Sequence, residues 1–246
     1  MTTGRPVPLS KIAEETVSEA VALPRAPNRS NEELSMRALL VPEMRKRWPG
    51  ARIIHELPLR YSEKRIDLAA ITETEIISVE IKSSRDTLDR LHGQVRGFVP
   101  VSDLIVVALA PGHWTKEEMV WEEGPRGRVG SIRYCDADRI LQEFGYSIGV
   151  WLADTENGRV QVERDAYDNK PGLWSAQLLD LLHVAELINV ASAHRVAVGK
   201  KRPDHRTLVR ACHDVMSGRE VKRAVCAALR ARSAFDKASD APRNAS

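Results

Sequence analysis

The run LIVVALA at residues 104–110 restricts the fold more than any other feature, because every position in it is apolar. A strand with one solvated face alternates apolar and polar residues, whereas a strand buried between two layers does not. A segment with helical periodicity precedes this run, and a strand-like run at residues 76–82 precedes that segment. A strand, a crossover helix and a second strand leave the two strands parallel in one sheet. The sequence therefore predicts an α/β fold with helices packed over a sheet.

A helix is predicted at the start of this core. Ser30 or Asn31 is a suitable N-cap, and the acidic residues that follow suit the amino end of a helix. Pro42 is a site where the helix could kink. The apolar residues that recur at helical spacing are Leu34, Ala38, Val41 and Trp48.

Three strands and a second helix complete the predicted core. The second helix is expected to follow an N-cap at Ser84 and to place Leu88, Leu91, Val95 and Phe98 on one face. The order of elements is then helix, three strands, helix, strand. The three strand-like runs, separated by turns, are RIIHELPLRY, RIDLAAI and IISVEIK.

The rest of the chain is predicted to add a hairpin and a helical region. SIGVWLAD and RVQVERDA flank the turn TENG and form the hairpin. Residues 174–188 have the pattern of one long helix, and two further helical segments follow. The predicted organisation is an N-terminal tail or docking arm at 1–29, a core with the added hairpin at 30–169, a helical basic region at 170–235 and a flexible tail at 236–246.

Composition excludes several classes of protein. The three cysteines lack CxxC spacing, which argues against a disulfide framework and against a zinc knuckle. No apolar run reaches the roughly 18 residues of a membrane span, and the amino terminus has no apolar signal-peptide segment. With 37 Lys and Arg against 34 Asp and Glu, the net charge of +3 indicates no partner by itself. We therefore expect a soluble, cytoplasmic protein without a membrane partner.

Charged residues on the 76–82 strand suggest a site. Alternation places Ser78, Glu80 and Lys82 on one face, where they could line a cleft rather than face open water. Asp67 lies on the preceding strand, and a hairpin would bring it next to Glu80. Two adjacent carboxylates repel unless a cation lies between them, and oxygen ligands of this kind suit Mg²⁺ or Mn²⁺. The alternative is a surface lattice of ion pairs that also includes Arg65.

The order of these parts resembles the PD-(D/E)xK nuclease superfamily, in particular a branch of small, largely uncharacterised bacterial and phage proteins. The resemblance extends from residue 30 to about residue 115. It rests on Arg65 with Asp67, on the run Glu80 to Ser83, and on the helical segment Thr87 to Gln94. It implies a restriction-endonuclease-like core and a Mg²⁺-dependent deoxyribonuclease that hydrolyses phosphodiester bonds. The proline of the superfamily name is absent, because Ile66 precedes Asp67.

The resemblance also assigns a role to each candidate residue. Asp67, Glu80 and the carbonyl of Ile81 would hold Mg²⁺ or Mn²⁺, which lowers the pKa of a bound water. Lys82 would assist that water, and Gln94 would position the lysine or the water. A helical glutamate, for which we favour Glu33, would complete the catalytic set.

Several alternatives stay open at this stage. Glu32 and Glu56 compete with Glu33 for the last position of the site. A second candidate function is a nucleic-acid-binding protein that keeps the scaffold without catalysis. A third is a module that binds other proteins through its carboxy-terminal helices. The expected partner is DNA, with RNA as the second candidate and with a homodimer or larger protein assembly left open.

Basic residues are concentrated near the carboxyl end. Residues 195–232 contain eleven basic and three acidic side chains, a local balance of +8 in a nearly neutral chain. The plain alternative is a solvated helical face. A phosphate-binding surface accounts better for how a carboxylate-rich site could attract a polyanion. The residues expected to contact nucleic acid are Lys200, Lys201, Arg202, Arg206 and Arg210.

Overall fold

The computed structural model describes residues 30–114, 118–124, 127–133, 137, 141–142, 144–167, 174–199 and 203–232. The predicted tails at 1–29 and 236–246 lie outside these ranges. The core elements follow the predicted order of helix, three strands, helix and strand. They are α2 (Asn31–Arg47), β1 (Arg52–Leu59), β2 (Lys64–Ile71), β3 (Ile76–Lys82), α3 (Leu91–Phe98) and β4 (Leu104–Leu109).

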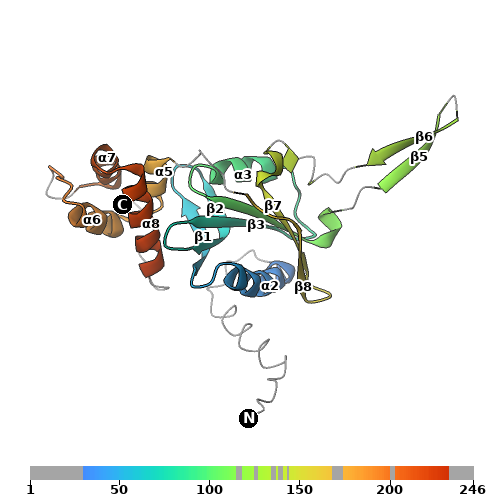
Figure 1. The fold of residues 1–246 in the computed structure, drawn as a ribbon, viewed down its shortest axis with the longest axis horizontal. Helices are drawn as coiled ribbons and strands as arrows, with labels where there is room; N and C mark the ends of the chain where they lie inside the picture. Colours follow the sequence, from blue (N-terminus) through green and yellow to red (C-terminus); the bar gives the residue numbers. More distant parts are fainter. Residues whose placement is uncertain are drawn as a thin grey trace, which may run out of the picture. The chain divides into compact units, whose positions relative to one another are not determined.

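Among the described residues, the hairpins β5–β6 and β7–β8 and the helices α5 to α8 follow the core (Figure 1). Short 3₁₀ turns at Pro111–His113 and Gly145–Ser147 flank the first hairpin. The strands are β5 (Glu118–Gly124), β6 (Gly127–Arg133), β7 (Gly149–Asp154) and β8 (Arg159–Arg164). The helices are α5 (Ser175–Asp180), α6 (Val184–Ala193), α7 (His205–Val215) and α8 (Gly218–Ala231).

Six strands form one mixed sheet in the order β1-β2-β3-β4-β7-β8. The hairpins β1–β2 and β7–β8 are antiparallel, whereas β4 and β7 pair in parallel. β3 and β4 are neighbours in this sheet, and every residue of β3 is buried. The α/β prediction is confirmed in these terms: an amino-terminal helix, a mixed sheet and a carboxy-terminal helical region.

Contacts group the chain into two compact units. The first contains Met1–Pro49, Val79–Gly93 and Val106–Tyr167. The second contains Gly50–Ser78, Gln94–Ile105 and Asp168–Ser246. The predicted domain boundaries stay a prediction.

In the first unit, α2 begins as its sequence predicts and packs on β7 and β8. The Ser30 hydroxyl accepts a hydrogen bond from the Glu33 N–H at 3.1 Å, which satisfies one free donor of the first turn. Trp48, at the end of the helix, stacks on Trp151 of β7 with ring centroids 5.8 Å apart. The buried apolar face differs from the expected one, since it consists of Met36, Leu40 and Met44.

In the second unit, helices α5 to α8 pack together around a leucine-rich core. The Asp204 carboxylate caps α7 by accepting a hydrogen bond from the Thr207 N–H at 2.7 Å. Ser217 and Glu220 form a capping box at the start of α8. Trp174 precedes α5, and its backbone N–H donates to the Pro100 carbonyl at 2.9 Å.

Two predicted helix boundaries were wrong, and one hairpin was not predicted. The long helix expected at 174–188 is broken, because Leu181 and Leu182 turn into the core and the His183 N–H donates to Glu186 as α6 begins. The second core helix begins at Leu91 rather than after Ser84, whose N–H and hydroxyl instead donate to the Glu32 carboxylate. The hairpin β5–β6 was not predicted, and it forms a two-stranded sheet of its own.

Within the described ranges, no helix has both the length and the hydropathy that a membrane crossing requires.

We expect Cys212 and Cys226 to resist thiol reagents in the folded protein. Both thiols are buried and free, burial raises the pKa of Cys212, and it raises the pKa of Cys226 to about 12. A raised pKa lowers the fraction of reactive thiolate at any pH below it. A Cys135→Ser variant labelled with a thiol reagent at mildly alkaline pH should react only as urea unfolds it. Rapid stoichiometric labelling without urea would contradict this burial.

Candidate nucleic-acid interface

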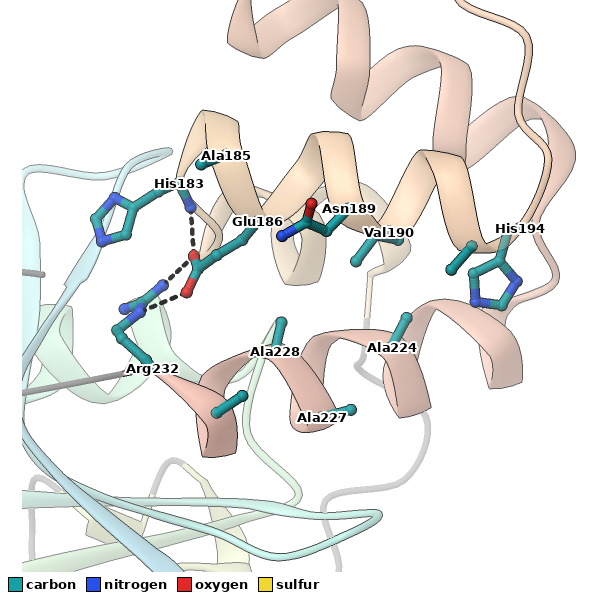
Figure 2. Close-up of a pocket in the computed structure, with 12 residues that line it drawn as sticks. His183, Ala185, Glu186, Asn189, Val190, His194, Ala224, Ala227, Ala228 and Arg232 are labelled. Carbon is teal, nitrogen blue, oxygen red and sulfur yellow. Dashed lines mark hydrogen bonds and ion pairs between the residues drawn. The ribbon is translucent and has the colours of Figure 1, made fainter.

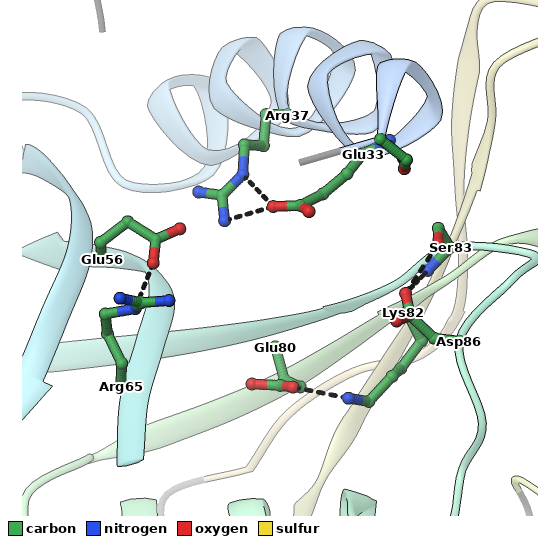
Figure 3. A network of polar contacts seen from close by, with 9 residues as sticks. Glu33, Arg37, Glu56, Arg65, Glu80, Lys82, Ser83 and Asp86 are labelled. Carbon is green, nitrogen blue, oxygen red and sulfur yellow. Dashed lines mark hydrogen bonds and ion pairs between the residues drawn. The ribbon is translucent and has the colours of Figure 1, made fainter. Parts of the chain in front are cut away.

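The residues predicted to line a catalytic cleft on β3 lie in the protein interior. Ser78 is 0%, Glu80 1% and Lys82 4% exposed, and the neighbouring Ile81 is 5% exposed. Lys82 Nζ donates to Glu80 Oε1 at 2.8 Å (Figure 3). Glu80 and Lys82 are therefore brought together as predicted, but as a buried ion pair rather than as an open face.

The two helical glutamates have donors from the protein itself. Glu33 Oε1 accepts from Nε and Nη2 of Arg37 at 2.9 and 2.8 Å, and the Arg37 side chain is only 1% exposed (Figure 3). Glu32 accepts from the backbone and hydroxyl of Ser84 at 3.1 and 2.6 Å. Glu33 is therefore bonded within α2, and Glu32 links the start of α2 to the loop that contains Ser84.

Asp67 and Gln94 belong to the other compact unit. Both side chains are half-buried, Asp67 on β2 and Gln94 on α3. The register of β1 with β2 places Glu56 opposite Asp67, since His55 pairs with Leu68 and Leu57 with Ile66. Glu56 has a positive φ of 58° and forms an ion pair with Arg65 (Figure 3). A positive φ is strained for a residue with a side chain.

No group of three or more His, Cys, Asp or Glu side chains suited to a metal ion occurs among the described residues. The Mg²⁺ or Mn²⁺ expected from the sequence stays a prediction.

The predicted basic surface is described only in part. Lys200, Lys201 and Arg202 lie outside the described residues. Arg206 and Arg210 are exposed on α7, and Arg210 has Asp214 as a neighbour at 3.7 Å. The two described members of the predicted set therefore reach solvent, as a phosphate contact requires.

A second group of basic residues lines a cleft at the start of α8. The cleft has a volume of about 460 Å³ and contains three cationic side chains within one helical turn and a half. Hydroxyl groups from two other segments face the same space. The lining residues are Thr74, Ser175, Leu178, Gly218, Arg219, Lys222 and Arg223.

Contacts around this cleft fix one cation and leave two exposed. Lys222 forms an ion pair with Asp103, which also accepts the Ile76 N–H at 2.8 Å and is 6% exposed. In the part of the chain that the structure describes, no carboxylate pairs with Arg219 or Arg223. Lys222 therefore holds α8 in place, while the two arginines are available to an anion.

A second hollow is a groove between α6 and α8. This groove has a volume of about 580 Å³ and a mostly alanine lining, and Figure 2 shows Ala224, Ala227 and Ala228 along α8. Arg232 closes one end by donating to both oxygens of Glu186 at 2.8 and 2.6 Å. Among the described residues that line this groove, Arg232 is the arginine, and no lysine is present.

Comparison with known protein families gives a match over part of the chain. Residues 27–122 are similar to a family described as Bacteriophage P4 protein cII. This region covers less than half of the chain, from before α2 through most of β5. No protein with a curated description and no solved structure matches the chain significantly.

This match corrects the sequence-based assignment. The resemblance to PD-(D/E)xK nucleases rested on residues 30 to about 115, and the same residues match the cII family instead. The expectations that followed from the resemblance, a nuclease and a Mg²⁺-dependent deoxyribonuclease, were wrong in the same way. The physical reason lies in β3, where Glu80 and Lys82 stabilise the interior as an ion pair. A Glu-x-Lys strand alone does not distinguish that role from a catalytic one.

Part of the cleft was not predicted from the sequence. Thr74 and Ser175 come from segments about 100 residues apart, and no local pattern connects them. One signal was present in the sequence: Arg219, Lys222 and Arg223 have the i, i+3, i+4 spacing that places side chains on one helical face. These three are among the eleven basic residues of 195–232, but the residues predicted to contact nucleic acid were Lys200 to Arg210, earlier in the sequence.

Proposed function

We propose that the chain is a nucleic-acid-binding protein and that the cleft at the start of α8 contacts the phosphate backbone. The observation that carries the proposal is the convergence of Arg219, Lys222 and Arg223 on one cleft. Arginine binds phosphate oxygens with two N–H donors at once, and hydroxyl groups such as those of Thr74 and Ser175 add further donors. DNA is the first candidate ligand and RNA the second.

The charge of the surrounding helices supports the same proposal. Arg206 and Arg210 present two further exposed cations on α7, and Lys200, Lys201 and Arg202 precede that helix in the sequence. Contacts of this kind neutralise phosphates without reading the base sequence. Binding should therefore be sensitive to salt and tolerant of sequence.

Two earlier expectations belong with this proposal. A cytoplasmic location suits a nucleic-acid-binding protein whose described thiols are reduced. The restriction-endonuclease-like description of the core stays a prediction, and phosphate binding by α8 does not depend on it.

The expected result is that wild-type protein binds fluorescent DNA with an affinity that falls steeply as salt rises. Replacing Arg219 and Arg223 by Ala should lower the slope of log affinity against log salt by about 1.8 on duplex DNA, since each phosphate contact contributes about 0.9. Affinity at low salt should fall about tenfold or more. The measurement is fluorescence anisotropy at several salt concentrations.

A matched control removes the same charge elsewhere. Arg128 and Arg159 are exposed in the other compact unit, and the Arg128→Ala/Arg159→Ala protein should keep the wild-type slope. A third variant, with Lys200, Lys201 and Arg202 changed to Ala, tests the upstream basic segment. Equal affinities and slopes for wild type and the Arg219→Ala/Arg223→Ala protein would overturn the assignment of the cleft. If wild type binds none of duplex DNA, single-stranded DNA and RNA, the proposed function is overturned.

A further inference from the structure

We infer that the cleft at the start of α8 binds single-stranded nucleic acid and that an unpaired base stacks on Trp174. This inference rests on the proposed function, because it names the form of nucleic acid that the same site takes. It is carried by an aromatic side chain that phosphate binding leaves unexplained.

Trp174 is exposed without a role in the core. Its side chain is among the large apolar groups that reach solvent, with 58% relative exposure. Tryptophan is highly buried on average, and an indole exposed to this degree is available to stack on a ligand.

The backbone of Trp174 is held on both sides. Its N–H donates to the Pro100 carbonyl at 2.9 Å, and its carbonyl accepts from the Leu178 N–H at 2.9 Å as α5 begins. The indole therefore projects from a fixed point, and ordering it against a ligand costs little conformational entropy compared with a flexible loop.

The position of Trp174 relative to the cations follows from its neighbours along α5. Ser175 and Leu178, one and four residues further on, both line the cleft. Trp174 is the N-cap residue of α5, with extended backbone angles, and it directly precedes Ser175, so its backbone lies at the margin of the cleft. The starts of α5 and α8 are also close, since a Cβ added at Gly218 would lie 3.4 Å from Ser175 Oγ.

This arrangement places a flat aromatic surface beside phosphate donors. Proteins that bind single strands combine a basic groove with aromatic side chains on which bases stack. In a duplex the face of each base is covered by its neighbours, so only an unpaired or displaced base can stack on an indole. The phosphate donors alone would accept either form. Trp174 is therefore the group that favours a single strand.

The amino end of α8 is not the anion donor in this arrangement. Ser217 caps its first turn. The Ser217 hydroxyl accepts a hydrogen bond from the Glu220 backbone N–H, and the Glu220 carboxylate accepts one from the Ser217 backbone N–H at 2.8 Å. The donors offered to a phosphate are the side chains of Arg219 and Arg223, which are exposed.

The test compares four short ligands of equal length: oligothymidine, oligouridine, an abasic DNA strand and a DNA duplex. Wild type should bind at least one of the two base-bearing single strands more tightly than the abasic strand and the duplex. Trp174→Ala should weaken that binding about tenfold, which corresponds to the stacking contribution of one base. It should leave the abasic strand and the duplex nearly unchanged. Trp174→Phe should restore most of the affinity, because a phenyl ring also stacks.

The control is Tyr167→Ala, which removes an exposed aromatic side chain (63% exposed) from the other compact unit and should leave all four affinities unchanged. Tighter binding of oligothymidine or of oligouridine than of the abasic strand and the duplex supports the inference. Equal loss on all four ligands in the Trp174→Ala protein would overturn stacking while leaving phosphate binding in place. No loss on any ligand would overturn it as well and would favour a protein partner for Trp174. Absence of all binding by wild type would instead refute the proposed function.

Discussion

Replacing Lys82 by Met should lower the free energy of unfolding by about 3–5 kcal/mol, the usual cost of removing one member of a buried ion pair. Lys82 and Glu80 are 4% and 1% exposed, and their Nζ and Oε1 atoms are 2.8 Å apart. The variant leaves the Glu80 carboxylate in the interior without this ammonium group. Because domains are stable by only about 5–15 kcal/mol in total, the effect should be plain in urea denaturation.

Two comparisons make this prediction specific. Lys46→Met removes a lysine that is 79% exposed and 3.7 Å from Glu43, and its effect should be about 0–1 kcal/mol. Adding Glu80→Gln to Lys82→Met should recover part of the loss, since the remaining group is then neutral. A Lys82→Met protein as stable as Lys46→Met would contradict a structural role for the pair.

Replacing Arg232 by Met should destabilise the helical region by about 2–3 kcal/mol, since charge-assisted hydrogen bonds to partly buried groups are lost. Arg232 is 10% exposed and donates to both carboxylate oxygens of Glu186, as Figure 2 shows. Its Nη2 also donates to the Leu181 carbonyl at 2.9 Å, at the point where α5 ends. One guanidinium thus joins the end of α8 to the turn between α5 and α6.

Arg230 provides the matched control. It is 35% exposed, and its partner Glu73 is 85% exposed at 3.5 Å, so Arg230→Met should cost about 0–1 kcal/mol. Arg232→Lys should recover little, because an ammonium group cannot make two parallel hydrogen bonds to one carboxylate. The measurement is thermal and urea unfolding followed by circular dichroism at a helix-sensitive wavelength. Similar stabilities for the Arg232 and Arg230 variants would show that the Glu186 pair contributes no more than a surface contact.

The buried pair also explains how the nuclease assignment arose. The strand IISVEIK carries Glu80 and Lys82 at the spacing that a nuclease site uses, and Asp67 lies on the neighbouring strand β2. Glu80 and Lys82 were expected on one face of this strand, and they form an ion pair with each other. Whether such a face is open to water depends on what packs over it. The family similarity of residues 27–122 is to the cII family and not to a nuclease family.

Local signals determined much of the secondary structure. The all-apolar run LIVVALA predicted a strand buried on both faces, and the structure buries Ile105 to Leu109 in β4. The turn TENG predicted the β7–β8 hairpin, and Ser30 predicted the start of α2. These predictions succeeded because caps, turns and strand periodicity depend on residues within a few positions of each other.

Other features required the tertiary structure. The apolar pattern from Trp174 to Ile188 continues across the end of α5, yet the chain turns there because Leu181 and Leu182 are buried and Arg232 binds the Leu181 carbonyl from 51 positions away. The buried face of α2 likewise follows from its contact with β7 and β8 rather than from its own apolar spacing. The sequence alone determined the core strands, the β7–β8 hairpin and the Ser30 cap, since those choices are local. Only the tertiary structure decided that Glu80 and Lys82 are enclosed and that the starts of α5 and α8 share one cleft, because burial and convergence depend on segments far apart in the chain.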